Sequence, residues 1–403
     1  MKQFFKLLCR RFKLGKFRKI ITSLIGLYTL FFNIIIEIFN NFIVVKNNTF
    51  LFCSYEGTKY DDSPKAIFDY LREVYKGDIF RYVWAFQQPS RFVLGSDIKI
   101  VKLYSLRFFY ECLRANYIIS NAVIAPRLNF IGSKTIYLNT WHGTALKKIG
   151  KDRKITSNNF CPRGTCIVDI MTAQSQYDIE IFSRAFMIPK ERFILTGMPR
   201  NDELIKYSNL DILKIKEELS IPSDKKVILY APTYRNYEYD ENKREYIEDS
   251  PIHFTQWQQV LGDEYVVLFR AHYYIAKILV KNLDSDFVID VSSYHSINNL
   301  IAVSDLLVSD YSSIFFDYSI TEKPMLCYPY DLERYKKEVG LYLNIEEVFS
   351  NGIIETEELL LNRIKNLDIK AEQIYTKKIK NRFIEAHGDA SRKVVEYLLD
   401  YRK

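Results

Sequence analysis

The sequence is poor in the residues that metal and disulfide sites require. It has 5 histidines and 6 cysteines in 403 residues, with no Cys-x-x-Cys pair and no His-Glu-x-x-His motif. Cys161 and Cys166 are too widely spaced for a zinc ribbon and have no histidine nearby. We therefore expect a reduced, cytosolic chain without a disulfide framework and without a protein-bound metal.

Glycine-rich nucleotide motifs are also missing. The chain has only 14 glycines, and none of them forms a Walker loop, a Gly-x-Gly-x-x-Gly fingerprint or a Gly-x-Ser-x-Gly elbow. This leaves a P-loop kinase or GTPase, a dinucleotide enzyme and an α/β-hydrolase without support. Hydrophobic residues make up 48% and charged residues 26%, which are the proportions of a globular protein.

The net charge of +8 lies entirely in the first nineteen residues. They hold eight basic residues and no acidic one, and the rest of the 57 basic residues equal the 49 acidic residues in number. A nucleic-acid-binding protein needs basic residues over a face of its fold. The neutral body therefore argues against a nucleic-acid partner.

An apolar stretch follows this basic arm. The residues from Ile20 to Ile36 carry no charge, and their number is at the lower limit for crossing a hydrocarbon core about 30 Å thick. Basic residues next to an apolar helix favour attachment to an anionic membrane surface, to which each cation contributes roughly 1 kcal/mol. We expect peripheral or monotopic attachment at the cytoplasmic face of the cell membrane. A single span and a helix packed on the body are the alternatives.

Beyond this segment, short apolar runs alternate with amphipathic stretches, which is typical of parallel sheets covered by helices. The runs form two series separated near 205–225, so we predict an α/β protein with two Rossmann-like, doubly wound domains that face a cleft. The predicted parts are a membrane-associating segment (1–47), a first domain (48–208) and a second domain (209–403) whose last helix crosses back. The expected strands are Thr49–Ser54, Arg81–Ala85, Tyr117–Ser120, Thr135–Leu138, Met171–Ala173, Phe193–Thr196, Val227–Tyr230, Tyr265–Arg270, Phe287–Asp290, Leu306–Val308 and Met325–Cys327.

Polar residues follow several strands at the ends where doubly wound sheets bind ligands. Thr140, Trp141, His142, Gly143 and Thr144 come directly after the strand at 135–138. A histidine at such a place can accept a proton from an attacking hydroxyl group because its pKa is near neutrality. It can also be a residue that only caps or packs.

The second series offers three further strand ends. Arg270, Ala271 and His272 follow the strand that begins at Tyr265, and guanidinium with imidazolium suits a diphosphate. An ion pair between domains is the alternative for the arginine. A turn with Pro232 and Thr233 follows the strand at 227–230. This turn either binds the edge of a nucleotide base or only reverses the direction of the chain.

The strand at 306–308 leads into Ser312 and Ser313, which would begin a helix. Free backbone N–H groups at a helix start hold phosphate, and Asp317, one turn later, could meet a sugar hydroxyl group. The alternative is an ordinary helix cap. The stretch 236–249 is acidic and is expected to be an exposed loop.

Six blocks stand in a specific order along the chain: WHGTALKKIGKD (141–152), TGMPRND (196–202), APTYR (231–235), RAH (270–272), VSDYSSIFFDY (308–318) and HGDASRKVVEYL (387–398). In this order they resemble the CDP-glycerol glycerophosphotransferases of teichoic-acid and capsule synthesis. The resemblance covers roughly 48–403. The departures are small: Ala145 stands where proline is frequent, and Met198 where an aromatic residue is common.

The resemblance implies a GT-B-type fold and transfer of polyol phosphate from a CDP-polyol to a hydroxyl group of an undecaprenyl-linked glycan or polymer, with release of CMP. It implies that His142 is the base and His272 a second essential histidine near the diphosphate. No cofactor is expected, and Mg²⁺ only in company with the nucleotide substrate. The implied donor contacts are Thr140, Trp141, Gly143, Thr144, Arg200, Pro232, Thr233, Arg270, Ala271, Ser312, Ser313 and Asp317.

Other functions remain open at this stage. CDP-glycerol is the favoured donor and CDP-ribitol the alternative, because the two polyol pockets would differ by a few side chains. A GT-B glycosyltransferase would use a nucleotide sugar and release UDP or GDP. A non-catalytic membrane-associated scaffold would not need His142 or His272, both of which are present.

Overall fold

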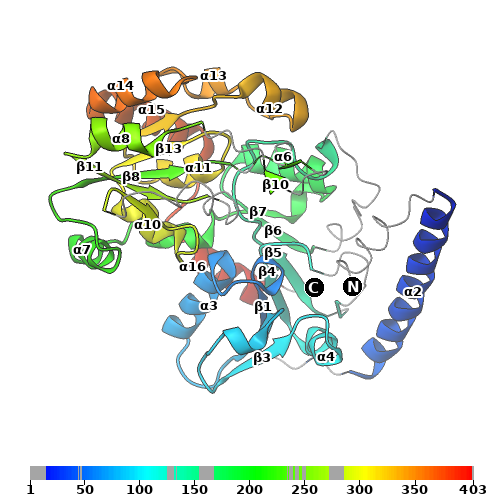
Figure 1. The fold of residues 1–403 in the computed structure, drawn as a ribbon. Coiled ribbons are helices and arrows are strands. Elements are labelled where there is room, and N and C mark those ends of the chain that lie inside the picture. The colour runs from blue at the N-terminus through cyan, green and yellow to red at the C-terminus, as the bar shows by residue number, and fades with distance from the viewer. Residues whose placement is uncertain are drawn as a thin grey trace.

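The computed structural model describes residues 15–43, 45, 48–124, 131–132, 134–153, 168–233, 235, 239–240, 245–246, 251–271 and 286–401. Within these residues the chain forms two parallel sheets with helices around them (Figure 1). The predicted α/β class with parallel sheets is therefore confirmed. His272 lies outside the described residues.

The first sheet has seven strands in the order β3-β2-β1-β4-β5-β6-β7, and every neighbouring pair is parallel. Its central strands are buried on both faces, as in the run TFLFC of β1, because helices cover the sheet on each side. The strands are β1 (Thr49–Cys53), β2 (Arg81–Phe86), β3 (Ile98–Lys102), β4 (Tyr117–Ser120), β5 (Ile136–Asn139), β6 (Ile170–Ala173) and β7 (Phe193–Leu195).

The second sheet has five parallel strands in the order β12-β11-β8-β13-β14. They are β8 (Lys226–Ala231), β11 (Tyr265–Phe269), β12 (Val288–Asp290), β13 (Leu306–Ser309) and β14 (Met325–Cys327). The stretch expected to be a loop at 236–249 instead contains a short antiparallel pair, β9 (Tyr239–Asp240) and β10 (Glu245–Tyr246). The rest of that stretch lies outside the described residues.

In both sheets the order in which strands are added reverses beside the first strand. In the first sheet the chain leaves β1 toward β2 and β3 on one side, and returns through β4 on the other. The second sheet repeats this with β8, which lies between β11 and β13. A doubly wound sheet has its ligand-binding crevice at such a switch point, beyond the carboxyl ends of the strands. The loops after β1, β4, β8 and β13 are thus where a ligand is expected.

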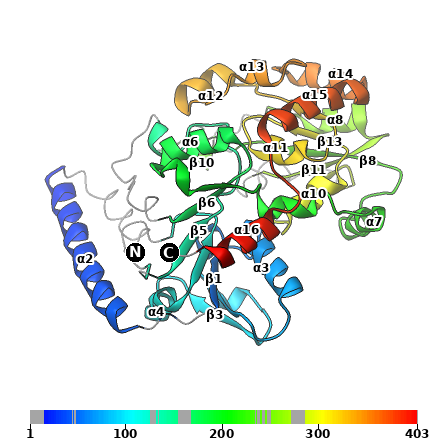
Figure 2. The ribbon, with the colours of Figure 1, turned by 180° about the vertical axis from the view of Figure 1, so that it is seen from behind.

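Helices cover the sheets and join them (Figures 1 and 2). Five short 3₁₀ segments also occur in the described chain; of these, η5 (Pro199–Glu203) matters for the site. The helices of the body are α3 (Asp62–Val74), α4 (Leu106–Arg114), α6 (Gln176–Phe186), α7 (Asn209–Glu218), α8 (Phe254–Leu261), α10 (Ile297–Val303), α11 (Ile314–Ser319), α12 (Leu332–Glu338), α13 (Ile345–Val348), α14 (Glu357–Lys365), α15 (Ile369–Phe383) and α16 (Ala390–Asp400).

The helix α16 packs against the first sheet, although it follows the second sheet in the sequence (Figure 2). Val394, Val395 and Leu398 are fully buried in the same apolar cluster as Phe50 of β1. The side chain of Asp202 accepts bonds of 2.8 and 2.7 Å from the backbone N–H groups of residues 390 and 391, at the start of the helix. A carboxylate at a helix N-terminus is stabilising because it binds free N–H groups there.

A short backbone pairing connects the two halves next to the predicted site. Lys147 and Leu341 form an antiparallel bridge, and the N–H group of Lys148 donates to the carbonyl of Gly340 at 3.0 Å. The Tyr342 hydroxyl group donates to Asp152 at 2.8 Å. The segment after His142 is therefore held by residues of the second half.

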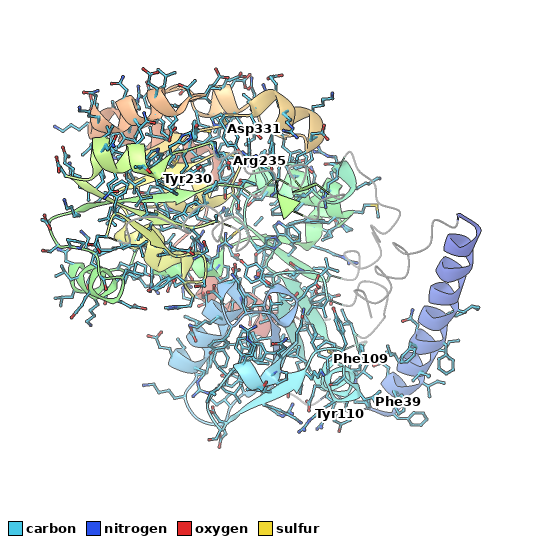
Figure 3. All side chains as sticks on the ribbon, viewed as in Figure 1. Phe39, Phe109, Tyr110, Tyr230, Arg235 and Asp331 are labelled. Atoms are coloured by element: carbon cyan, nitrogen blue, oxygen red, sulfur yellow. The ribbon has the colours of Figure 1, made fainter. Side chains whose placement is uncertain are left out.

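The helix α2 (Gly15–Phe42) stands apart from the sheets in Figure 1 and approaches the body near α4. Ile36 packs into the core there, and Figure 3 places Phe39 beside Phe109 and Tyr110. Among the described residues, none of the helices combines the length and apolar character needed to cross a membrane. Several large apolar side chains of α2 are exposed, namely Leu27, Leu30, Phe31, Ile34, Ile38, Phe39 and Phe42.

Candidate functional site

The loop after β5 carries His142 and is rigidly held. The N–H group of Trp141 donates to Asn139 Oδ1 at 2.8 Å, and the Trp141 ring packs 4.4 Å from that of Phe186 of α6. Trp141 and Gly143 both have positive φ, at 51° and 143°. Left-handed backbone at a non-glycine residue costs energy and is concentrated at functional sites, where the surroundings enforce it.

The hydrogen bond of His142 determines which of its ring nitrogens is basic. Nδ1 lies 2.8 Å from the carbonyl oxygen of Asn121, which follows β4. A carbonyl can only accept, so Nδ1 carries the proton and the lone pair is on Nε2. Burial lowers the pKa of His142 below its ordinary value of 6.5, so the ring is neutral at neutral pH. His142 thus has the protonation state of a general base.

Arg200 connects this loop to both sheets. Its Nη1 donates to Asp62 at 2.8 Å and to the carbonyl of His142 at 2.9 Å, and its Nη2 donates to Asp317 at 2.6 Å. Asn201 Nδ2 donates to the other oxygen of Asp317 at 2.8 Å. Burial raises the pKa of Asp317, and the Arg200 guanidinium opposes that rise. The two Nη atoms of Arg200 and the carboxylate of Asp317 thus bind protein groups, whereas the buried Nε of Arg200 has no hydrogen-bond partner among the described residues. Asp317 holds Arg200 rather than presenting a free carboxylate.

The start of α11 touches the His142 loop. A Cβ atom added to Gly143 would lie 2.7 Å from Ser313 Oγ, closer than real Cβ contacts allow. Ser313 makes no side-chain cap bond, whereas Ser312 Oγ accepts from the N–H group of Ile314 at 3.3 Å. The structure therefore brings together two sequence blocks that lie far apart in the chain. Only glycine permits this approach, since any side chain there would displace Ser313.

The switch point of the second sheet is held by a buried network that sequence reasoning missed. Asp310 accepts bonds from the N–H groups of Thr233 (2.9 Å) and Tyr311 (2.6 Å) and from Arg235 Nη2 (2.8 Å). Arg235 is 1% exposed and also pairs with Asp331 at 2.8 Å. Figure 3 shows Arg235 and Asp331 side by side in this half.

Aromatic rings complete the surroundings of Arg235. The rings of Tyr311, Tyr330 and Tyr335 lie 4.8, 5.0 and 5.1 Å from its guanidinium carbon. Such cation–π contacts stabilise a desolvated cation. Beside this network, the buried Thr233 Oγ1 has no hydrogen-bond partner among the described residues. Pro232 lies in the same turn and is half-buried.

Arg270 and Ala271 follow β11, as the sequence indicated. Arg270 Nη1 donates to the carbonyls of Val291 (3.0 Å) and Tyr294 (3.1 Å), and the N–H group of Ala271 donates to Ser292 Oγ at 3.1 Å. Burial lowers the pKa of Arg270. The role predicted for His272 stays a prediction. In the part of the chain that the structure describes, no three His, Cys, Asp or Glu side chains are arranged to hold a metal ion.

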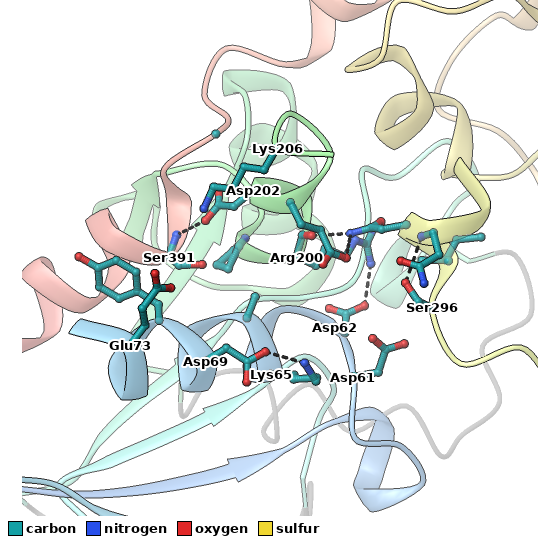
Figure 4. Close-up of a pocket in the computed structure, with 18 of the residues that line it drawn as sticks. Asp61, Asp62, Lys65, Asp69, Glu73, Arg200, Asp202, Lys206, Ser296 and Ser391 are labelled. Atoms are coloured by element: carbon teal, nitrogen blue, oxygen red, sulfur yellow. Dashed lines mark hydrogen bonds and ion pairs between the residues drawn. The ribbon is translucent and has the colours of Figure 1, made fainter. Parts of the chain in front are cut away.

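A cavity of about 470 Å³ lies beside Arg200, between α3, η5, α10 and the start of α16 (Figure 4). Figure 4 shows Asp61, Asp62 and Arg200 at one end of it, while His142 is not part of its wall. Acidic residues outnumber basic ones in the wall, so the cavity is unsuited to a polyphosphate. The acidic wall residues are Asp61, Asp62, Asp69, Glu73, Asp202, Glu203 and Asp389, and the basic ones are Lys65, Arg200, Lys206 and Arg392.

Two doubly wound sheets with polar groups at both switch points are typical of enzymes that use a nucleotide substrate. A match to a family model identifies the family to which the chain belongs. The chain belongs to the CDP-Glycerol:Poly(glycerophosphate) glycerophosphotransferase family, whose model matches residues 35–400. The resemblance inferred from the six sequence blocks is therefore confirmed.

Among its relatives is the teichoic acid glycerol-phosphate transferase of Staphylococcus aureus, which is 34% identical over 81% of this chain and 85% of the relative. The teichoic acid poly(glycerol phosphate) polymerase of Staphylococcus epidermidis is 37% identical over 83% of this chain. That match covers 47% of the polymerase, so the chain spans about half the length of this relative.

Solved structures agree with this assignment. The wall teichoic acid polymerase TagF superposes with a TM-score of 0.82 at 32% identity, over 96% of this chain and 98% of the TagF chain. A histidine-to-asparagine variant of TagF, soaked with CDPG, also gives 0.82. The UDP-GlcNAc 2-epimerase of Neisseria meningitidis is 14% identical with a TM-score of 0.55, which is a likeness of fold alone.

Proposed function

We propose that the chain transfers glycerol phosphate from CDP-glycerol to a hydroxyl group of a lipid-linked acceptor, with release of CMP, in teichoic-acid or capsular polymer synthesis. The observation that carries the proposal is the His142 loop, where a neutral histidine with a basic Nε2 lies beside the start of α11 and a buried Arg200. Membership of the glycerophosphotransferase family and the TagF structure soaked with CDPG support it.

The residues of the site suggest how the transfer proceeds. Nε2 of His142 takes the proton of the acceptor hydroxyl group, and the oxygen attacks the phosphorus that carries the glycerol. The bond from that phosphorus to the bridging oxygen breaks, and CMP leaves with the electron pair. Arg270 and the hydroxyl and N–H groups around Ser313 stabilise the charge that develops on the leaving phosphate. Thr233 would contact the nucleotide with its unpartnered hydroxyl group.

CDP-ribitol is the second candidate donor. A teichoic acid ribitol-phosphate polymerase of Staphylococcus aureus is 31% identical over 50% of this chain, a shorter match than that of the glycerol-phosphate transferase. The longer match favours glycerol.

The proposal includes the arrangement of the protein at its membrane. We infer a GT-B-type pair of domains, one for each sheet, and attachment of α2 to the cytoplasmic face as a peripheral or monotopic anchor. The exposed apolar side chains of α2 and the eight basic residues of the first nineteen support this attachment. An anchored enzyme would meet a lipid-linked acceptor at the surface where that acceptor resides.

Release of CMP tests the proposed reaction. The full chain is incubated with CDP-glycerol, CDP-ribitol or UDP-sugars, with bacterial membranes as the acceptor source. We expect CMP from CDP-glycerol only, in an amount that depends on added membranes. Release of CMP from CDP-ribitol alone would show that CDP-ribitol is the donor. Release of UDP from a UDP-sugar would contradict the proposed class of reaction.

A further inference from the structure

We propose that Lys59 and Arg270, which come from opposite halves of the molecule, jointly bind one phosphate group of a substrate. This inference rests on the proposed transferase function and adds a residue that the sequence blocks do not contain. The phosphate belongs to the diphosphate of the nucleotide donor or to the anionic part of the acceptor, and the experiment below separates these sources.

Lys59 lies in the loop between β1 and α3, at the switch point of the first sheet. Its backbone forms an antiparallel bridge with Ser54, the residue after β1. Three residues in or next to this loop have a positive φ although they are not glycine: Tyr55 (46°), Glu56 (53°) and Asp62 (67°). The surrounding structure therefore enforces a costly backbone, which is expected where a loop must present side chains precisely.

Tyr55 connects Lys59 to the reactive histidine. The ammonium of Lys59 is 5.1 Å from the centroid of the Tyr55 ring, and that ring is 5.8 Å from the ring of His142. Tyr55 is itself fixed, since its N–H group donates to Asn121 Oδ1 at 2.7 Å and its hydroxyl group to Asp62 at 2.5 Å. Asn121 thus holds both His142 and the ring beneath Lys59.

Arg270 reaches this neighbourhood from the second sheet. Its Nη1 donates to the carbonyl of Tyr294, and the residues after Tyr294, His295 and Ser296, line the same cavity as Tyr60 and Asp61, which follow Lys59. The hydrogen bonds of its guanidinium go to two backbone carbonyls, those of Val291 and Tyr294. Neither Arg270 nor Lys59 forms an ion pair with a carboxylate of the described chain. Burial lowers the pKa of Lys59, and the neighbouring Arg270 guanidinium lowers it further. Two cations that repel one another across the two halves would both be stabilised by an anion between them.

The carboxyl groups nearby do not already fill that position. Asp62 is held by Arg200 at 2.8 Å. Asp61 acts electrostatically on both Lys59 and Arg270, but among the described residues no ion pair joins it to either cation. A phosphate suits the remaining charge, because a guanidinium binds its oxygens in a fork and an ammonium adds a point charge.

Substitution of Lys59 by methionine tests the inference in the full chain. Lys76→Met is the matched control, since Lys76 is an exposed lysine just after α3. We expect Lys59→Met to raise KM at least tenfold for one substrate and Lys59→Arg to restore part of it. A higher KM for CDP-glycerol assigns the phosphate to the donor, and a higher KM for the acceptor assigns it to the acceptor. Equal KM values in Lys59→Met and Lys76→Met, with an active parent chain, overturn the inference alone.

Two further measurements separate this inference from the proposed function. Calorimetry with inorganic pyrophosphate needs no transferase activity, and we expect weaker binding to Lys59→Met than to Lys76→Met. Equal binding to these two variants contradicts the shared anion site. In a double-mutant cycle with Arg270→Gln, two cations that hold one phosphate give non-additive losses in kcat/KM, whereas additive losses count against a shared ligand.

Discussion

The two switch points are built differently, although the sheets that form them share one topology. In the second sheet, the charged groups beside β8 and β13 are paired with one another, as Asp310 is with Arg235 and Arg235 with Asp331. In the first sheet, His142 follows β5, binds the residue after β4 and has a basic Nε2. Lys59 follows β1 and forms no ion pair among the described residues. One switch point is a stable platform, and the other keeps its reactive groups available.

This contrast follows from what each side must do. Paired buried charges fix a loop in one geometry, which suits the binding of a nucleotide that arrives in one orientation. A buried neutral base and a cation without a carboxylate partner are costly to maintain, and they persist where a ligand binds them. Substitution of His142 should therefore lower activity, and substitution of Arg235 should lower stability.

The largest effect is expected for His142→Ala. Removal of a general base typically lowers kcat by roughly 10²–10⁴-fold, and the melting temperature should stay near that of the parent because His142 contributes one hydrogen bond. CMP release and thermal unfolding measure the two quantities. His253→Gln is the control, since His253 is exposed and pairs with Glu357. If the His142→Ala variant keeps the activity of the parent, His142 is not the base.

The pH dependence of the parent enzyme sharpens this prediction. The pKa of His142 lies below 6.5, so its neutral form persists to lower pH than for an exposed histidine. The acidic limb of kcat against pH should therefore fall below pH 6.5, and it should be absent in the residual activity of His142→Ala.

Arg235→Met should lower stability rather than change the chemistry directly. It leaves the buried Asp310 and the partly buried Asp331 without their cation, and breaking a buried pair in this way costs about 3–5 kcal/mol. Chemical denaturation measures the loss. If Arg235→Met unfolds like the parent chain, the second switch point is not the stable platform described above.

Asp178→Asn tests the support under the His142 loop. Asp178 accepts from Thr144 Oγ1 at 3.1 Å, and burial raises its pKa to about 7. The pKa of Asp178 in the folded chain exceeds the unfolded value of 3.8. Its contribution to stability is therefore fully present below about pH 4 and is lost as the pH rises to about 7. The asparagine variant should lack this decline and gain stability relative to the parent at pH 8. Parallel curves of unfolding free energy against pH would contradict a raised pKa.

Thr233→Val should have the smallest effect. The hydroxyl group it removes has no partner among the described residues, so stability should not fall. If that hydroxyl group binds the nucleotide, KM for CDP-glycerol should rise about five- to tenfold, the equivalent of one hydrogen bond of roughly 1 kcal/mol. An unchanged KM would mean that the platform holds the donor by other groups.

The apolar runs made most of the fold predictable. The expected strand at 117–120 matches β4, and the ends of most others differ by one residue, because fully buried strands have continuous apolar sequences. The strand β3 was not predicted, since in IKIVK two lysines interrupt the apolar pattern at a partly exposed edge. The short pair β9 and β10 was missed because its residues are polar.

The sequence predicted that the candidate residues follow strands, but it did not predict the contacts between residues distant in the chain. The spacing of residues in the sequence does not show that Gly143 contacts Ser313. It also does not show that Arg200 forms ion pairs with Asp62 and Asp317. The burial of Arg235 was also invisible, because arginine is usually a surface residue. Lys59 lies outside every recognisable block, and only its place in the fold marks it.

The return of α16 to the first sheet has a consequence for synthesis of the chain. The apolar cluster around Phe50 needs Val394, Val395 and Leu398, which the ribosome adds some 340 residues later. Until then the first half exposes an unfinished surface, and it cannot mature as an independent unit while the second half is being made. The order of translation thus makes the completion of the first half wait for the last helix.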